Sequence, residues 1–127
     1  MYLSHFIKLI SDDRLQDCVD SLLLMQNPDG GFSSYERTRS STLLEHLNAS
    51  EVFDRIMVEY SYPECTTAVV TALSLFKQYF PSYRPKEING VIERAVKYVI
   101  KAQRPDGSWY GSWGVCFTYA SFFAMQC

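Results

Sequence analysis

The chain has 127 residues, enough for one compact domain, and a formal net charge of -2 at pH 7. Nine Tyr, eight Phe and two Trp accompany a charged fraction of 20%, so aromatic surface is abundant and favours burial or a pocket. Lys and Arg form no long run, and the positive field that nucleic-acid binding requires is missing, so nucleic acid is excluded as an expected partner.

The cysteines and the apolar segments indicate the compartment. The four cysteines lie far apart, form no Cys-x-x-Cys pair and follow no secretory signal. We therefore expect reduced thiols in an intracellular protein. No apolar run approaches the roughly 20 residues needed to cross a bilayer, and Ser4, His5 and Lys8 interrupt the apolar start of the chain. The sequence predicts no membrane span.

Helical spacing of apolar residues begins behind Ser11. The first predicted helix carries one apolar face, made of Leu15, Val19, Leu22 and Met25. It ends at the turn 27–31, where a proline and two glycines interrupt helical geometry. A second helix is predicted to begin at Asn48, because that side chain could cap free amides while Glu51 reaches back.

Three further helices are expected. One starts at Cys65 and is closed by Pro81, with the stripe Ala68, Val69, Ala72, Phe76 and Phe80. The next starts at Pro85 and ends at 104–107, with the buried face Ile88, Val91, Ile92, Ala95, Tyr98, Val99 and Ala102. Residues 114–125 are apolar on nearly every side, which predicts a helix enclosed by others. Since no segment alternates like a strand, the fold class is all-α.

An internal repeat organises the chain. Gln-Asn-Pro-Asp-Gly-Gly-Phe at 26–32 returns as Gln-Arg-Pro-Asp-Gly-Ser-Trp at 103–109, each time after a predicted helix. A unit of this kind cannot bury both of its faces alone, so such units should stack into an α/α toroid. The chain holds too few units to close one.

The repeated turn resembles the QW motif of the terpene cyclase and mutase family, with Gln103 and Trp109 in one copy and Gln26 and Phe32 in the other. Residues 27–36, 48–53, 62–66 and 106–119 resemble blocks of oxidosqualene cyclases, those of the lanosterol synthase type above all. The resemblance runs from about Asp12 to the end of the chain. It implies that residues 1–127 are a fragment of the C-terminal barrel domain, a partial α/α toroid or incomplete α6-α6 barrel.

The resemblance also implies an activity. Oxidosqualene cyclases convert 2,3-oxidosqualene to a tetracyclic sterol-type triterpene by cationic cyclisation, with no cofactor and no metal. Their protonating motif, Asp-Cys-Thr-x-Glu, is absent here. The stretch Glu64-Cys65-Thr66 is a different site, and Asp17 and Cys18 do not replace the acid. We therefore expect the chain to be inactive alone.

Catalytic roles are implied for two residues. Cys65 matches the cysteine that hydrogen-bonds the missing aspartate and favours its charged form, and Tyr35 matches a tyrosine near the final deprotonation site. Judged without the family, Tyr35 is an ordinary loop tyrosine after a Gly-Gly turn. Neither His5 nor His46 falls in a matching block, and both are interpreted as surface or capping residues.

Substrate-binding and structural roles are implied for the others. Trp113 matches a cavity-lining tryptophan, and aromatic faces can stabilise a carbocation without reacting with it. Phe53 matches a pocket wall, Ile56 a channel constriction, and Tyr119 lies near Trp113; for these three, ordinary core packing is an equal alternative. The glutamines and aromatic residues of the two turns are expected to be structural, each glutamine accepting from backbone amides at a neighbouring helix start.

Three alternatives remain open. A protein prenyltransferase β subunit would hold zinc through Asp, Cys and His, but no spacing supports such a site. A squalene-hopene cyclase would carry Asp-x-Asp-Asp, which is absent. A non-catalytic, truncated product would depend on a partner, because its start and its end within a helix would leave apolar faces exposed. Location at the endoplasmic reticulum membrane or at lipid droplets is implied only by the resemblance.

Overall fold

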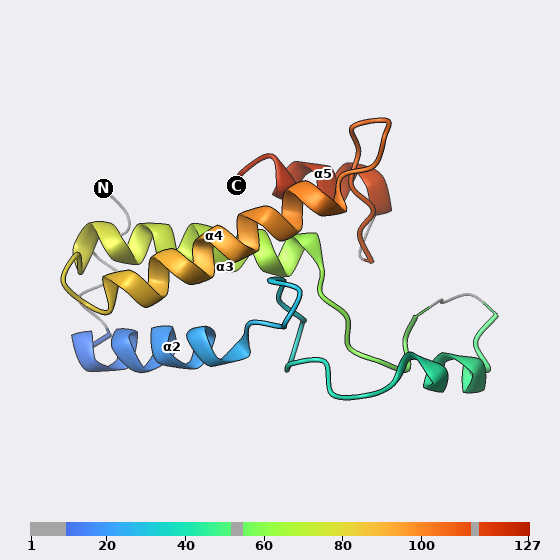
Figure 1. Ribbon diagram of the computed structural model, residues 1–127, viewed down its shortest axis with the longest axis horizontal. Helices are drawn as coiled ribbons and strands as arrows, with labels where there is room; N and C mark the ends of the chain where they lie inside the picture. Colours follow the sequence, from blue (N-terminus) through green and yellow to red (C-terminus); the bar gives the residue numbers. More distant parts are fainter. Residues whose placement is uncertain (1–9, 52–54, 113–114) are drawn as a thin grey trace.

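The computed structural model describes residues 10–51, 55–112 and 115–127. These residues form four α-helices, α2 (Asp12–Met25), α3 (Pro63–Tyr79), α4 (Pro85–Ala102) and α5 (Cys116–Ala124), and the 3₁₀ helix η1 (Thr42–Leu47) (Figure 1). Within these ranges there is no strand, and Phe32 and Tyr62 form an isolated antiparallel bridge. The all-α expectation is confirmed.

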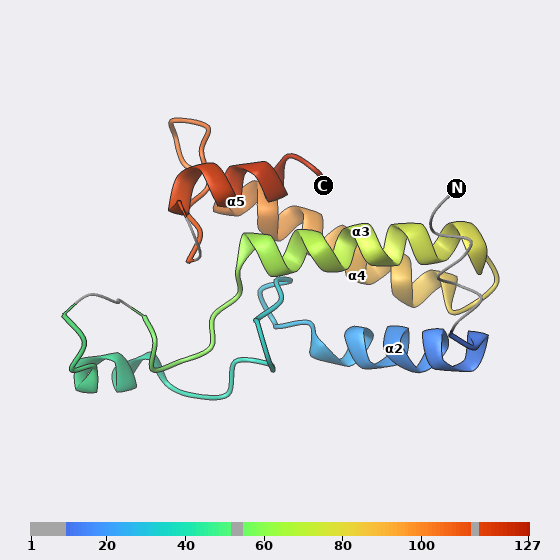
Figure 2. The same ribbon diagram turned by 180° about the vertical axis from the view of Figure 1, so that it is seen from behind.

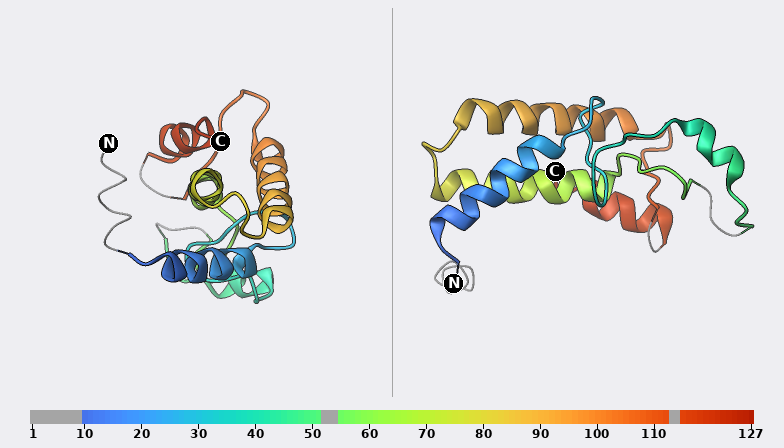
Figure 3. Two further views of the ribbon diagram at one scale, coloured as in Figure 1. Left: turned by 90° about the vertical axis from the view of Figure 1, so that its left-hand side faces the viewer. Right: turned by 90° about the horizontal axis from the view of Figure 1, so that it is seen from below.

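Helix α3 lies at the centre of the arrangement. It runs beside α4 along most of its length, and α2 and α5 lie on different sides of it (Figures 1 and 2). The end-on view in Figure 3 shows α2, α4 and α5 on three sides of α3. Figure 1 shows that η1 lies apart from these helices. The core between the helices includes Leu73 and Ile88, both fully buried.

Local signals explain where three helices begin. Proline occupies the first turn of α3 and of α4, where its missing N–H removes no helical hydrogen bond. Asp12 and Asp13 lie in the first turn of α2, where negative charge favours the helix dipole. The expected first, third and fourth helices are confirmed, with α3 beginning two residues earlier than the sequence indicated.

The predicted apolar stripe of α3 was partly wrong. Ala68 and Ala72 are exposed, whereas Val70, Leu73 and Phe76 are buried. The buried stripe is rotated because α3 packs against α4 on one side and α5 on another. The expected face of α4 is correct at its fully buried positions, Ile88, Val91, Ala95 and Val99.

The expectation that the last helix is enclosed was wrong for the described residues. In α5 only Ala120 and Ala124 are buried, while Phe117 and Phe122 are 44% and 59% exposed. Helix α3 packs against α5, and these aromatic residues of α5 are left exposed.

The helix predicted to begin at Asn48 is also absent from the described residues. Asn48 ends η1, and its Oδ1 accepts a hydrogen bond from Ser50 N at 2.9 Å, forming a local turn instead of a helix cap. The carboxylate of Glu45 accepts from Val58 N at 3.1 Å and from Tyr60 Oη at 3.0 Å. These longer-range contacts tie Glu45 to residues 58–60.

The isolated bridge joins the first repeated turn to the start of α3. Phe32 N donates to Thr66 Oγ1 at 2.9 Å, and Thr66 Oγ1 donates to Tyr62 O at 2.7 Å. Tyr62 N in turn donates to Phe32 O at 2.9 Å. Phe32 is therefore fixed through its backbone while its ring is buried in the core.

Replacing Thr66 with valine should lower the free energy of unfolding by about 1–3 kcal/mol, because the buried N–H of Phe32 loses its acceptor. Thr67→Val is the matched control, since the Thr67 hydroxyl donates only to carbonyls of its own helix, and a loss below about 1 kcal/mol is expected. Urea unfolding followed by far-ultraviolet circular dichroism measures both. Equal losses would contradict the importance of the Phe32 contact.

All four cysteines lie within the described ranges and are free thiols. None of the helices in those ranges combines the length and the hydropathy required to cross a bilayer.

Candidate functional site

The two repeated turns are built by the same hydrogen bonds. We call residues 26–32 the first turn and residues 103–109 the second turn. In each, the glutamine side chain donates to the carbonyl of a glycine four residues later, at 2.9 Å. That glycine has a positive φ, 92° at Gly30 and 84° at Gly107. An aspartate side chain accepts from the amide that follows the glycine, at 2.9 and 3.0 Å. The turns are thus equivalent in local geometry.

The first turn packs directly on α4. Gln26 is buried, and its Nε2 also donates to Val91 O at 2.9 Å while its Oε1 accepts from Arg94 Nε at 2.8 Å. The expectation that the glutamine accepts from amides at a helix start was wrong here. Gly30 packs against the backbone carbonyl of Arg94, in the middle of α4. Gln26 therefore meets the carbonyl of Val91 and the side chain of Arg94 instead of amides at a helix start.

The second turn has no helix packed on its glutamine in the described part of the chain. Gln103 is exposed, and its side chain bonds within the turn to Gly107 O. Trp109 is half-buried instead, and its Nε1 donates to Val99 O at 2.7 Å. Its backbone N donates to Ser121 Oγ at 3.1 Å, which ties the second turn to α5.

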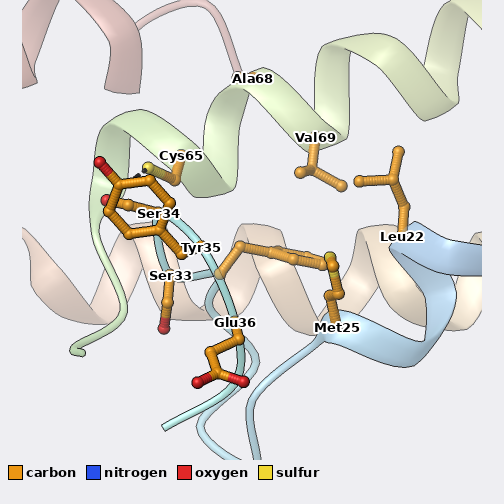
Figure 4. Close-up of a pocket in the computed structure, with 10 residues that line it drawn as sticks. Leu22, Met25, Ser33, Ser34, Tyr35, Glu36, Cys65, Ala68 and Val69 are labelled. Carbon is orange, nitrogen blue, oxygen red and sulfur yellow. Dashed lines mark hydrogen bonds between the residues drawn. The ribbon is translucent and has the colours of Figure 1, made fainter.

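A pocket of about 280 Å³ lies between α2, the segment after the first turn and α3. Its lining residues are Leu22, Met25, Phe32, Ser33, Ser34, Tyr35, Glu36, Cys65, Ala68 and Val69. Figure 4 shows Tyr35, Ser34 and Cys65 together at one end, with Leu22, Met25 and Val69 at the other. Tyr35 and Cys65, two of the sequence-predicted site residues, therefore share one pocket.

The surroundings of Cys65 keep its thiol neutral. Burial raises the pKa of the Cys65 thiol above its usual range, and the neighbouring carboxylates of Glu64 and Glu59 add to this effect. The Ser34 hydroxyl, 3.8 Å from Sγ, acts in the opposite direction. A neutral thiol retains its S–H as a weak hydrogen-bond donor, which a thiolate could not provide.

A polar network fixes the segment that carries Tyr35. Asn27 Nδ2 donates to Ser33 Oγ at 2.8 Å and to Ser61 Oγ at 2.9 Å. Its Oδ1 accepts from Thr38 N at 2.9 Å. The Tyr98 hydroxyl donates to Ser61 O at 2.6 Å, and burial raises the pKa of Tyr98 well above its ordinary value, so it remains a donor. The network fixes the segment 33–36, which forms one wall of the pocket.

The structure places Ile56 and Tyr119 away from this pocket. Ile56 is 55% exposed and lies in the extended segment after η1, and Tyr119 is 39% exposed on α5, where its ring meets Phe123 edge to face. Neither lines the pocket. Phe53 and Trp113 lie outside the described residues.

Sequence reasoning gave no role to three residues that the structure places at important contacts. Ser34 lies against Cys65, and Arg94 bonds to Gln26. A third, Glu64, is buried in the first turn of α3, with its carboxylate against Gly111. Because each contact joins segments far apart in sequence, spacing alone gave no signal for it.

The described ranges contain no group of three or more His, Cys, Asp and Glu side chains that could hold a metal ion. The side chains that line the pocket offer a thiol, a phenol, hydroxyls, a carboxylate and an apolar wall.

Comparison with known proteins gives a consistent set of relatives. The model of the squalene-hopene cyclase C-terminal domain matches residues 8–127. A lanosterol synthase of Aspergillus fumigatus is 62% identical over 122 residues, covering 96% of this chain and 16% of the relative. A cycloartenol synthase of Dictyostelium discoideum is 51% identical, covering 95% and 17%.

A protostadienol synthase of Aspergillus fumigatus is 46% identical, covering 95% of this chain and 16% of the relative. The chain thus spans about one-sixth of the length of these curated relatives. Because the domain match extends over nearly all of the sequence, the chain belongs to the squalene-hopene cyclase C-terminal domain family and corresponds to a C-terminal region of oxidosqualene cyclases.

Proposed function

We propose that this chain forms part of an oxidosqualene cyclase that converts 2,3-oxidosqualene to a tetracyclic, sterol-type triterpene. The observation that carries the proposal is the pocket shared by Cys65 of α3 and Tyr35 of the segment after the first turn. The relatives that support it are synthases of lanosterol, protostadienol and cycloartenol. The skeleton that the parent enzyme would make is left open by this diversity.

The proposed reaction begins with protonation of the epoxide, which breaks one C–O bond and leaves a hydroxyl group and a carbocation. The acid is supplied by a part of the enzyme other than this chain, and the S–H of Cys65 donates to its carboxylate. A hydrogen bond to the charged form lowers the pKa of an acid and makes it a stronger proton donor. The neutral state of Cys65 supports this role.

The later steps move the positive charge through the growing ring system until a proton is lost, so substrate and product have the same atoms. Tyr35 would stabilise a late cation or pass on this proton. Trp113, Phe53, Ile56 and Tyr119 would line other parts of the complete cavity, where ring faces attract a cation by about 0.5–2 kcal/mol each. No cofactor or metal takes part in this proposal.

The complete fold would be an α/α toroid in which QW turns join neighbouring helix pairs. Two observations support this: the two turns share their hydrogen bonds, and the first turn is seated on a helix of the following unit through Gln26. Gln103 would form the equivalent side-chain hydrogen bonds with a helix of the next unit. The enzyme would act at the surface of the endoplasmic reticulum or of lipid droplets.

A chimeric enzyme tests the proposal. The 122 matched residues of the Aspergillus fumigatus lanosterol synthase are replaced by those of this chain, and cyclised product from 2,3-oxidosqualene is measured by gas chromatography with mass spectrometry. The chimera should be active and the 127-residue chain alone inactive. A folded chimera that converts no substrate would overturn the proposed function.

Within the chimera, Cys65→Ala should lower the turnover number about ten- to a hundredfold, because a hydrogen bond to a charged group contributes about 1.5–3 kcal/mol. Cys18→Ala is the matched control. Cys18 is exposed on α2 and does not line the pocket, so turnover should be unchanged. Equal activity of the two variants would remove Cys65 from the mechanism.

A second candidate is a non-catalytic helical module that acts only with a partner. It is favoured by the exposed apolar side chains of η1 and α5, including Leu47 at 71% and Phe122 at 59%. Size-exclusion chromatography with light scattering discriminates here, since a monomeric chain that unfolds cooperatively would count against this candidate.

A further inference from the structure

Ser34 is the polar neighbour of Cys65 within the pocket. Its hydroxyl oxygen lies 3.8 Å from Cys65 Sγ, and both residues line the same hollow (Figure 4). The distance lies within hydrogen-bonding range for sulfur, and either atom can act as the donor. The contact joins the segment after the first turn to the first turn of α3.

The backbone on both sides of this contact is fixed. Ser34 N donates to Glu59 Oε2 at 3.1 Å, and two residues earlier Phe32 O accepts from Tyr62 N at 2.9 Å. Cys65 lies inside α3, between the buried residues Glu64 and Thr66. Ser34 therefore meets Cys65 at a set distance, and rotation of the hydroxyl hydrogen decides which atom donates.

A thiol that must donate to a ligand has one hydrogen for that purpose, while its sulfur can still accept. If Ser34 accepted the S–H, none would remain for the pocket. If Ser34 donates to sulfur, the S–H is free to point at an acceptor in the pocket. We propose that Ser34 is a positioning residue whose hydroxyl donates to Cys65 Sγ and so directs the S–H toward the acid of the proposed cyclase, on which this inference rests.

The pKa of the Cys65 thiol responds to its electrostatic surroundings and can report the contact with Ser34. The titratable groups near Cys65 are Glu64 on the same helix, Glu59 and Tyr62 before it, Tyr98 on α4, and Tyr35 and Glu36, which line the same pocket. The carboxylates and burial raise the pKa of Cys65, whereas the Ser34 bond lowers it. Removing the Ser34 hydroxyl should therefore raise this pKa further, because the thiolate loses a donor.

The test follows the alkylation of Cys65 by iodoacetamide against pH in the 127-residue chain, resolved by peptide mass spectrometry. Ser34→Ala should move the midpoint for Cys65 upward by roughly half a pH unit, since the lost bond is weak and one unit corresponds to 1.36 kcal/mol. Ser34→Thr keeps the hydroxyl and should restore the midpoint. A midpoint, unlike a rate, does not depend on how easily the reagent enters the pocket.

Two internal controls accompany this measurement. Cys18 is exposed on α2. Its alkylation shows in every variant whether the reagent is active and whether α2 is unchanged. Ser33→Ala removes the neighbouring hydroxyl, which accepts from Asn27 and does not contact Cys65, so the Cys65 midpoint should stay in place. The inference is overturned if Ser34→Ala leaves the midpoint unchanged, or if Ser33→Ala or Ser34→Thr moves it as far.

The chimeric synthase supplies the second arm. Ser34→Ala should lower the turnover number about fivefold with KM unchanged, and Ser34→Thr should restore it. Full activity of Ser34→Ala would overturn the positioning role even with a shifted midpoint. An inactive parent chimera would instead overturn the proposed function, and with it the role of the contact in cyclisation. The alkylation midpoints of Cys65 would still show whether the Ser34–Cys65 hydrogen bond forms.

Discussion

Replacing Gly30 with alanine should lower the free energy of unfolding by about 3–5 kcal/mol, from backbone strain of about 1–3 kcal/mol and overpacking of similar size. Gly30 has a φ of 92°, which a residue with a Cβ rarely adopts. An added Cβ would lie 2.5 Å from Arg94 O and 3.0 Å from Arg94 C. Both atoms belong to the backbone of α4 and cannot move aside as a flexible side chain would.

Gly107→Ala is the control for this prediction. Gly107 occupies the same position in the second turn with a φ of 84°, but an added Cβ would meet nothing within 4 Å. Only the conformational strain remains, and a loss of about 1–2 kcal/mol is expected. Urea unfolding of the two variants measures the difference. Equal losses would mean that the first turn does not pack on α4 as tightly as the structure shows.

Gln26→Leu should lower the free energy of unfolding by about 2–4 kcal/mol, because buried polar groups lose their partners. Gly30 O loses its side-chain donor, and the Arg94 guanidinium loses the acceptor that holds it beside the turn. Leucine has a similar volume, so the loss reports the hydrogen bonds more than a cavity. Val91 O retains its helical partner and contributes less.

The second turn again provides the comparison. Gln103→Leu removes the equivalent bond within the turn, 2.9 Å in both copies, but Gln103 is exposed. A loss below about 1 kcal/mol is expected, since water replaces the partner. The difference between the two variants therefore measures the contact with α4. Thermal unfolding checks the ranking, and a larger loss for Gln103→Leu would contradict it.

Local sequence signals predicted most of the helix positions. Asp12 and Asp13, Pro85 and the Pro-Asp-Gly turns act within a few residues, so the ends of α2 and α4 could be read directly. The false helix at Asn48 shows the limit of such signals. An asparagine suits a helix cap and a local turn equally well, and the contacts of Glu45 with Val58 and Tyr60 favour the turn.

Burial was harder to predict than helix position. The aromatic residues of α5 indicate a helix enclosed by others, but enclosure depends on which segments surround it, and among the described residues α3 and the second turn pack against α5 and leave several of its side chains exposed. The stripe of α3 was shifted for a related reason. Periodicity gives the number of apolar faces, whereas their direction is set by where neighbouring helices pack.

The candidate site was predicted through resemblance and not through chemistry visible in the sequence. Cys65 and Tyr35 lie thirty positions apart in the sequence, and only the family resemblance singled out both before the structure placed them in one pocket. The roles assigned to Ile56 and Tyr119 remain proposals, and Phe53 and Trp113 lie outside the described residues. Ser34 was overlooked because a serine beside a Gly-Gly turn has an ordinary explanation as a loop residue.

The seating of the first turn on α4 bears on how the polypeptide matures on the ribosome. Gln26 finds its acceptor 65 residues later and its guanidinium partner 68 residues later. While the residues between them are being synthesised, Gln26 has no helix α4 to pack on, because a contact between distant residues can form only after both have left the ribosome. The hydrogen bonds between Gln26 and α4 can therefore form only after α4 has been synthesised.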